Sequence, residues 1–432
     1  MIRTRPRGRI HYAWIVAAVT FPVLLATAGI RAAPGVLILP LEHDFGWNRT
    51  TVSFAVSINL LLYGLCGPWI ANFIDRWGLR RVVIVALSVS GAGVALTTLM
   101  HAAWQLDLLW GVVVGLATGA TAMVLAAAVA NRWFVKSRGM VMGLLTSANA
   151  AGNMIFLPLL AILVVNAGWR PVVLVVAAIS LLMVPIVAAF MRDRPEDVGL
   201  AAYGADEAIS AAPSEDGISA IAALRMGIRT LDFWLLGVSY FICGASTLGL
   251  IGTHFIPASV EHGIPEVTAA SLLATMGIFN IAGTTVSGWL TDRVDGRWLL
   301  CGYYLSRGLS LLFLPFAFGL GIAGLVGFMV FYGLDWVATV PPTVVLSNGI
   351  FGKRNGAVVF GWMSAAHQIG SAFAALGAGE LRTWLGDYQV AFMSSGLLCL
   401  IAAGVVIRIG RGAKGEVAQP LLPMELGVAP VA

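Results

Sequence analysis

The sequence predicts an all-α membrane protein of twelve transmembrane helices, arranged as two six-helix bundles. First, 59% of the 432 residues are hydrophobic and 11% are charged, with a mean hydropathy of +0.89, which lies outside the range of soluble domains. Second, apolar runs of about twenty residues, the length that crosses the hydrocarbon core, recur along nearly the whole chain. Third, short motifs recur at half the length of the chain.

Each apolar run defines one expected helix, with ends uncertain by a few residues. The first six are expected at about 13–40, 50–72, 81–99, 103–130, 139–165 and 169–191. The second six are expected at about 231–257, 266–290, 298–317, 320–348, 357–380 and 387–407.

The net charge of +5 fits either nucleic-acid binding or membrane topology, and the placement of the 26 basic residues decides between them. Of these, 21 lie in segments on the same side as the N-terminus and 3 lie in loops on the other side. This bias predicts that both termini are cytoplasmic, with membrane lipids rather than nucleic acid as partner. Only 3 of the 26 are Lys, a bias that we link to a GC-rich bacterial genome and hence to the bacterial inner membrane.

The N-terminus and the cysteines each allow a second interpretation. The basic start and the triplet Ala26-Thr27-Ala28 also fit a cleaved signal peptide, but the apolar run continues to Leu39, which favours a retained first helix. The cysteines lie inside apolar spans at no metal-ligand spacing, so we expect no disulfide, no metal and no cofactor. They are Cys66, Cys243, Cys301 and Cys399.

Matching residues lie 217 positions apart, which predicts an internal repeat. Gly46 matches Gly263, and Asp75 matches Asp292. The matches fall at equivalent helix ends, so the repeat unit is six helices and both units have the same orientation. A parallel repeat of this kind places a substrate site between the halves, near the middle of the membrane.

The repeat and one polar stretch set the expected domain boundaries. We expect an N-terminal bundle over 1–191, a cytoplasmic linker over 192–230, a C-terminal bundle over 231–410 and a cytoplasmic tail over 411–432. A flexible linker of this length spans on the order of 35 Å, enough to join two moving bundles. A small regulatory domain within the linker is the alternative.

The strings FIDRWGLRR at 73–81 and GWLTDRVDGR at 288–297 place Asp and Arg at adjacent helix ends. They resemble the inside-loop signature of the major facilitator superfamily, although Ala71 stands where the family has Gly. The resemblance covers the whole chain and implies the fold of that superfamily, with a gate of Asp–Arg contacts to the opposite half. The alternative is charge that only sets topology. The expected gate residues are Asp75, Arg76, Arg80, Asp292, Arg293 and Arg297.

Two further strings, LEHDFGWNRTTVS at 41–53 and NRWFVKSRGMVMGLLTSANAAG at 131–152, resemble the monocarboxylate transporter family and its bacterial relatives. This resemblance implies a small organic acid as substrate. The chain departs from the animal members in the eighth helix, where Asn280 and Thr284 replace an Asp and an Arg. The motifs of drug antiporters are absent, because Trp110 stands near the expected Arg and Leu157 precedes Pro158.

Polar residues inside apolar spans mark candidate sites, because hydrocarbon makes an unpaired polar group costly. Arg31 lies in the outer half of the first helix, close to the position at which the monocarboxylate family has a substrate-binding Lys. The resemblance therefore implies that Arg31 binds a carboxylate. Snorkelling to the interface or pairing with a neighbour is the alternative.

Two polar stripes occupy equivalent helices of the halves, the fifth and the eleventh, at spacings of three and four residues. A further matched pair lies on the second and eighth helices. We expect these residues to face a central cavity, with hydrogen bonding inside each bundle as the alternative. With Arg31, the candidate substrate-binding residues are Asn59, Tyr63, Thr146, Asn149, Asn153, Asn280, Ser364, His367 and Ser371.

Arg307 and Asp335 fall near the middle of consecutive helices, so we expect them to form an ion pair within the membrane. The pair is structural, or else its carboxylate takes a proton and couples transport to the proton gradient. Pro341 and Pro342 must break the hydrogen-bond ladder of the tenth helix and bend it.

The sequence favours a secondary transporter of a small organic anion, with protons as the coupling ion and alternating access between the halves. The alternative is a carrier of a neutral or aromatic metabolite, in uptake or export. A membrane sensor would normally append a soluble signalling domain, and the linker and tail are too small for one. An intramembrane enzyme would need a nucleophile with a base, or a metal cluster, and neither occurs among the intramembrane residues named above.

Overall fold

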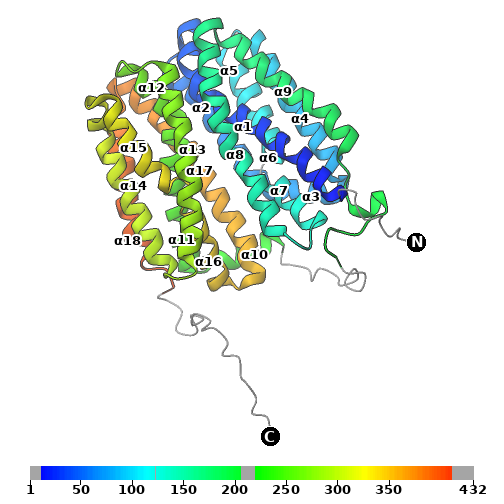
Figure 1. Cartoon of the computed structure of the whole chain (residues 1–432). Coiled ribbons are helices and arrows are strands. Elements are labelled where there is room, and N and C mark those ends of the chain that lie inside the picture. Colours follow the sequence, from blue (N-terminus) through cyan, green and yellow to red (C-terminus); the bar gives the residue numbers. More distant parts are fainter. Residues whose placement is uncertain (1–10, 122, 206–218, 411–432) are drawn as a thin grey trace.

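The computed structural model describes residues 11–121, 123–205 and 219–410. Within these ranges the chain is almost entirely helical and has no strand, only one isolated bridge between Phe134 and Tyr203. Figure 1 shows the helices as two groups, one formed by α1–α9 and the other by α11–α18. The all-α membrane fold that the sequence predicts is therefore confirmed.

The N-terminal half follows the expected ranges, with interruptions inside two of its helices. The expected helix at 50–72 is divided at Cys66, and the expected helix at 103–130 contains a π-helical segment, η2. The elements are α1 Tyr12–Phe45, α2 Arg49–Leu65, α3 Gly67–Trp77, α4 Leu79–Leu96, η1 Thr97–Leu99, α5 Ala103–Leu106, η2 Asp107–Val114, α6 Gly115–Ala120, α7 Met123–Trp133, α8 Arg138–Ala167 and α9 Trp169–Phe190.

The C-terminal half has a second π-helical segment, η4, and the expected break in its fourth membrane helix. The break lies between α15 and α16, and Pro341 and Pro342 occupy the start of α16, where a missing N–H group is tolerated. The elements are α11 Leu231–Gly244, η4 Ala245–Ile251, α12 Gly252–Glu261, α13 Glu266–Thr291, α14 Gly296–Gly319, α15 Gly321–Asp335, α16 Val340–Phe351, α17 Lys353–Leu385 and α18 Gln389–Val406.

Ten helical segments in the described part of the chain are long and apolar enough to cross a membrane. The two remaining members of the expected twelve are the interrupted pair α2–α3 and the long, more polar α17. α2 and α17 pack on each other between the halves. Their polar side chains are thereby shielded from lipid, which explains how a less apolar helix is accommodated.

Equivalent turns of the two halves share one backbone conformation. Gly46 and Gly263 have φ angles of 67° and 78°, and Gly168 and Gly386 have φ angles of 79° and 86°. A side chain would strain these positions, because only glycine adopts positive φ at little cost. The glycines thus fix where α1, α12, α8 and α17 end.

The described parts of the expected linker pack on the halves instead of forming a free chain. Tyr203 accepts backbone hydrogen bonds from Val135 and Lys136 and donates one to Trp133 in the N-terminal half. The short helix α10, Ala220–Gly227, packs on α17, and Trp362 donates its indole N–H to the Ala220 carbonyl. Residues 206–218 and the expected tail at 411–432 lie outside the described residues.

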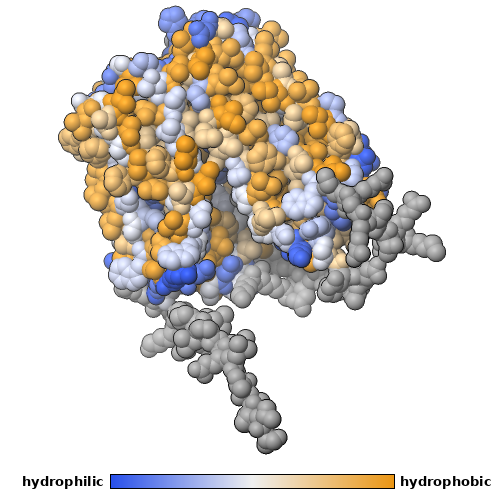
Figure 2. Space-filling view, viewed as in Figure 1, coloured by the Kyte–Doolittle hydropathy of each residue, from blue (hydrophilic) through white to orange (hydrophobic). Residues whose placement is uncertain are grey.

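The halves meet differently at the two ends of the molecule. We name the end that holds residues 11 and 410 the terminal face, and the end where α1 and α17 finish the far face. α1 and α2 contact α12 and α17 toward the far face, and α8 packs against α13. Figure 2 shows a hollow between the halves that opens toward the terminal face.

Candidate functional site

Arg31 lies on the inner side of α1, in a cavity of about 30 Å³ within the N-terminal half. Its guanidinium carbon is 3.7 Å from the centroid of the Tyr63 ring, which belongs to α2. Thr146 and Asn149 of α8 line the same cavity. The structure therefore brings together four of the ten candidate substrate-binding residues, from three helices.

Two threonines that the sequence analysis did not select complete this cavity. Thr27 of α1 and Thr121 of the bend after α6 both line it, and their hydroxyl groups are joined by a hydrogen bond of 2.8 Å. Among the described residues, no Asp or Glu pairs with Arg31. The cavity thus offers one cation and several hydroxyl and amide groups, with apolar side chains between them.

Asn59 does not join this face, although it lies one helical turn from Tyr63. It is buried, and its amide donates a 2.7 Å hydrogen bond to the Trp110 carbonyl within the N-terminal half. Trp110 belongs to η2, and a π-helical segment disturbs the regular pairing of backbone carbonyls. Asn59 therefore satisfies the backbone of η2 in this conformation. Asn153 is half-buried on α8 and is absent from the residues that line the cavity.

The candidate residues of the C-terminal half also differ in their surroundings. His367 of α17 is half-buried, and its ring contacts the Tyr240 ring in a tilted arrangement with centroids 5.0 Å apart. Arg31 and Arg307 are its charged neighbours. Ser364 donates to a carbonyl of its own helix.

Two other candidates of that half form hydrogen bonds within it. Ser371 is buried and donates to the Gly244 carbonyl at 3.0 Å. Asn280 accepts from Thr284 on α13. Among the described C-terminal candidates, His367 is therefore the one with a charged neighbour from the other half, Arg31.

Arg307 and Asp335 form a fully buried ion pair inside the C-terminal half. Arg307 Nε donates to Asp335 Oδ2 at 2.6 Å, and a second guanidinium nitrogen donates to the Asp335 carbonyl at 2.7 Å. Arg307 also contacts the Cys243 sulfur at 2.8 Å. Asp335 Oδ1 is buried without a hydrogen-bond partner in the described structure. One oxygen of this carboxylate is thus paired and the other is left free.

At the terminal face, the contacts recorded for the expected gate residues stay within their own half. Asp75 pairs with Arg132 at 2.5 Å, and the Arg80 backbone N–H donates to Asp193 at 2.7 Å. Arg297 pairs with Asp295 at 2.5 Å and holds the pKa of that carboxyl below its usual range. The other three expected residues are exposed, and Arg293 lies over the Trp289 ring; they are Arg76, Asp292 and Arg293.

The far face carries a charged network that the sequence analysis missed, and it joins the halves. Arg49 is 5% exposed, pairs with Glu42 at 2.6 Å and reaches Glu261 of α12 at 3.2 Å. Its guanidinium also donates to the Tyr388 hydroxyl. Arg382 of α17 pairs with Glu261 at 2.9 Å. We call these residues, Glu42, Arg49, Glu261, Arg382 and Tyr388, the far-face closure.

Hydroxyl contacts extend the far-face closure along α2 and α17. Thr50 and Thr383 are joined at 2.9 Å by their hydroxyl groups, and Thr50 Oγ1 lies 3.4 Å from the Gly379 carbonyl. In the sequence Arg49 lies between two expected helices and resembles any basic residue of a loop. The signal that could have found it is Glu42, a carboxylate seven residues earlier, across the turn at Gly46.

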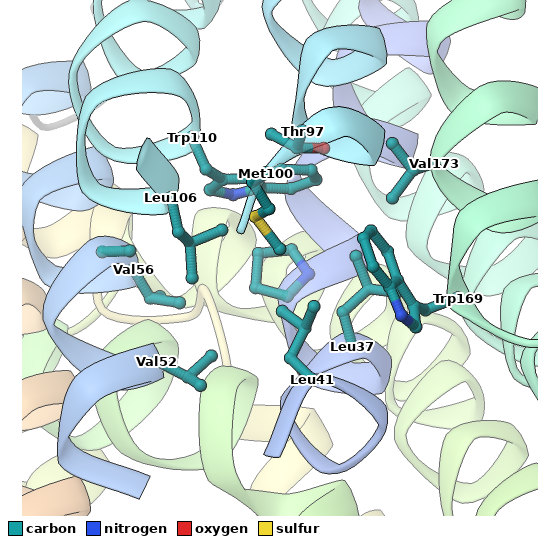
Figure 3. A pocket seen from close by; sticks show the side chains of 12 residues that line it. Leu37, Leu41, Val52, Val56, Thr97, Met100, Leu106, Trp110, Trp169 and Val173 are labelled. Atoms are coloured by element: carbon teal, nitrogen blue, oxygen red, sulfur yellow. The ribbon is translucent and has the colours of Figure 1, made fainter. Parts of the chain in front are cut away.

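A second cavity lies within the N-terminal half toward the far face, and Figure 3 shows Trp110, Trp169 and Met100 around it. Its volume is about 20 Å³, and its lining is apolar apart from Thr97. Its lining offers no charged group that could hold an anion. The candidate substrate site is therefore the region around Arg31.

Comparison with known proteins decides the family. A family model described as "Major Facilitator Superfamily" matches residues 19–375, and a second match covers 256–421. The chain belongs to the major facilitator superfamily. It is thus a multi-pass membrane transporter rather than an enzyme, as the inside-loop strings implied.

Relatives and solved structures agree with this membership. The uncharacterized MFS-type transporter YcxA of Bacillus subtilis (strain 168) is 24% identical over 416 residues, covering 94% of each chain. Monocarboxylate transporter 11 of Homo sapiens is 24% identical over 429 residues, covering 93% of this chain and 83% of that protein. These relatives fit the monocarboxylate transporter resemblance at the family level.

The fold matches a crystal structure of a bacterial homolog to the human lysosomal transporter Spinster, in an inward-facing and unoccupied conformation. The TM-score is 0.71 at 15% identity, and the match covers 94% of this chain and 98% of that chain. At this identity the likeness concerns the fold alone. It agrees with the two groups of helices in Figure 1.

Proposed function

We propose that this transporter carries a small organic anion together with protons across the bacterial inner membrane, by alternating access between its two halves. The observation that carries the proposal is Arg31, a half-buried cation in a membrane-spanning helix with no carboxylate partner among the described residues. It lies beside hydroxyl and amide groups from α1 and α8.

The magnitudes favour an anion at Arg31. Placing an Arg in the centre of a membrane helix costs about 2.5 to 3.5 kcal/mol on insertion scales. The contact with the Tyr63 ring returns about 0.5 to 2 kcal/mol. A carboxylate bound in the cavity would supply the remainder through charge-assisted hydrogen bonds. A neutral substrate would leave the charge uncompensated.

The proton-coupling part of the proposal rests on the pair Arg307 and Asp335. The free Oδ1 of Asp335 is the atom at which a proton would bind. Protonation would remove the charge that holds Arg307, so it would change the packing of α14 against the break between α15 and α16. Since α11 contributes Cys243 and Tyr240 to the same region, such a change would reach His367, whose ring contacts Tyr240.

Alternating access is supported by the contrast between the faces. The far-face closure joins the halves, while the gate residues of the terminal face pair within their own half. If the positive-inside bias holds, the hollow opens to the cytoplasm in this conformation. Asp75 and Arg297 are then available to contact the other half when the terminal face closes.

The experiment is a ligand-stabilisation screen of the purified transporter against small monocarboxylates, dicarboxylates and neutral metabolites. A ligand that binds the folded state raises the melting temperature by mass action. We expect a monocarboxylate to stabilise the parent protein and to lose its effect in Arg31→Gln. Stabilisation by a neutral or aromatic compound alone, unchanged in Arg31→Gln, would support the alternative carrier function.

A further inference from the structure

His254 of α12 lies directly behind the far-face closure and has no part in the transport mechanism described above. It is 0% exposed, and both ring nitrogens are engaged. Nε2 lies 2.8 Å from the Ala375 carbonyl of α17, and Nδ1 lies 3.0 Å from the Tyr388 hydroxyl. A buried histidine with two such contacts is a fixed member of the closure rather than a surface group.

The chemistry of the partners assigns every hydrogen in this chain of contacts. A backbone carbonyl only accepts, so Nε2 of His254 carries a hydrogen. In the neutral ring Nδ1 then accepts, and the Tyr388 hydroxyl donates to it. The Tyr388 oxygen is left to accept from Arg49. Neutral His254 therefore orients Tyr388 to receive Arg49 of the opposite half.

A proton on Nδ1 of His254 would reverse the hydrogen bond between His254 and Tyr388. Nδ1 would become a donor, and the Tyr388 hydroxyl would lose the acceptor for its own hydrogen. A second positive charge would also face Arg49 across Tyr388. In a poorly hydrated region, each of these changes weakens the contact that joins α2 to the C-terminal half.

The four charged groups of the far-face closure are already paired with one another. α1 contributes Glu42, α2 Arg49, α12 Glu261 and α17 Arg382, which makes two positive and two negative groups that are already paired. α13, which also packs against α12, begins at Glu266, whose Oε1 is buried without a hydrogen-bond partner in the described structure and has no described contact with His254. A charged His254 would be the uncompensated member of this set.

Solvent nevertheless reaches the closure. The side chains of Glu42 and Glu261 are 19% and 22% exposed, so a proton from the far side can reach the network through their carboxylates. Arg49 keeps its protons, so a proton reaches Nδ1 of His254 only when the contact between Arg49 and Tyr388 opens. A proton bound there shifts the population toward the open far face, because the closed one accommodates a charged His254 poorly.

We propose that His254 is the proton-binding site that opens the far face of the transporter. Neutral His254 holds Tyr388 for Arg49 and keeps the far face closed, and a proton taken from the far side when this contact opens prevents it from forming again. The inference rests on the alternating access of the proposed function. It adds a proton site distinct from Asp335, placed where it acts on the closure before any substrate binds.

The experiment measures the opening of the far face without a substrate. Spin labels are attached at His43→Cys and Trp384→Cys, two exposed positions of the far face in opposite halves, with the native cysteines replaced. Distances between the labels are measured in lipid nanodiscs at about pH 8 and about pH 5.5, on either side of the ordinary histidine range. We expect one short distance at the higher pH and a several-fold rise in a longer-distance population at the lower pH.

Two variants and one control separate His254 from other titrating groups. His254→Gln should show the same distances at both pH values. Tyr388→Phe, which keeps the ring and removes the link, should show the longer distance already at about pH 8. His262→Gln should respond as the parent does, because His262 bonds to the Ala258 carbonyl and stacks on Phe318 instead of Tyr388.

Two results would overturn the inference: a parent protein without a pH response, or a response that persists in His254→Gln. Adding the acid identified by the stabilisation screen distinguishes this failure from failure of the proposed function. If the acid changes the distances and pH does not, alternating access stands and the role of His254 is wrong. If neither changes them, alternating access fails as well.

Discussion

Two arginines inside apolar helices illustrate how residues of one type take different roles in this transporter. Arg307 is fully buried and has a carboxylate, a carbonyl and a thiol as partners. Arg31 is half-buried and has an aromatic ring beside a polar cavity. The first is satisfied by the protein itself. The second has capacity left for a ligand.

At the residue scale, the Arg307–Asp335 pair should behave as a buried ion pair. Asp335→Asn or Arg307→Gln alone should destabilise the protein by about 3 to 5 kcal/mol, because each leaves one buried group unpaired. The double variant should recover much of that loss. Thermal unfolding in detergent measures all three. Equal destabilisation in the single and double variants would contradict the pairing.

The matched control for this prediction is the pair Asp295 and Arg297 at the terminal face, which is partly exposed. Asp295→Asn and Arg297→Gln should each cost about 0 to 1 kcal/mol, since solvent screens the charges. The contrast between the two pairs tests whether burial, rather than charge alone, determines the loss.

Tyr63 allows a second residue-scale prediction. Tyr63→Phe keeps the ring beneath Arg31, whereas Tyr63→Leu removes the cation–π contact, which is worth about 0.5 to 2 kcal/mol. We therefore expect Tyr63→Leu to weaken binding of the acid by a few-fold to some tens-fold, and Tyr63→Phe to bind it nearly as the parent does. Titration calorimetry with the purified variants makes the comparison. Equally weak binding in both variants would indicate that the hydroxyl, not the ring, matters.

At the scale of elements, the contact between α2 and α17 depends on close approach of their backbones. A Cβ atom added to Gly379 would lie 2.4 Å from Ser53 Oγ. Nothing lies within 4 Å of a Cβ atom added to Gly377, two residues earlier on the same helix. We expect Gly379→Ala to lower the melting temperature and loosen the far face. Gly377→Ala should leave both unchanged or raise stability slightly, through helix propensity. The same loss in both variants would mean that helix flexibility, not packing, is responsible.

The helices and their partners were predictable from the sequence to different extents. Apolar runs locate the helices, and the repeat at 217 residues groups them into two halves. Equal depth on consecutive helices suggests the pairing of Arg307 with Asp335. The π-helical segment η2 was not predictable, because nothing in its composition distinguishes it from an α-helix. For that reason the spacing from Tyr63 placed Asn59 toward the cavity, although it bonds to Trp110.

At the scale of the whole molecule, the structure shows a transporter joined at its far face and parted at its terminal face. The joining residues come from α1, α2, α12 and α17 and from the turn before α18, so they are distant in sequence. In the sequence, Arg49 and Arg382 stand at loop positions, where a single charge is common. Their role depends on the relative placement of the halves, which local sequence does not encode.

The orientation of the molecule can be tested by labelling. Glu196 is exposed near the terminal face and Trp384 is exposed at the far face. An impermeant thiol reagent applied to intact cells should modify Trp384→Cys and spare Glu196→Cys, because the basic terminal face is expected in the cytoplasm. Permeabilised cells supply the control, in which both should react. The reverse pattern in intact cells would show that the predicted topology is inverted.

The central claim is that Arg31 binds an anion which the transporter moves with protons, and uptake into proteoliposomes tests it most directly. The acid found in the stabilisation screen is supplied outside, with and without an inward proton gradient, to vesicles holding the parent or Arg31→Gln at matched stability. We expect gradient-stimulated uptake by the parent, reduced uptake in Arg31→Lys through lost bidentate geometry, and none in Arg31→Gln. Normal uptake by Arg31→Gln would contradict the account.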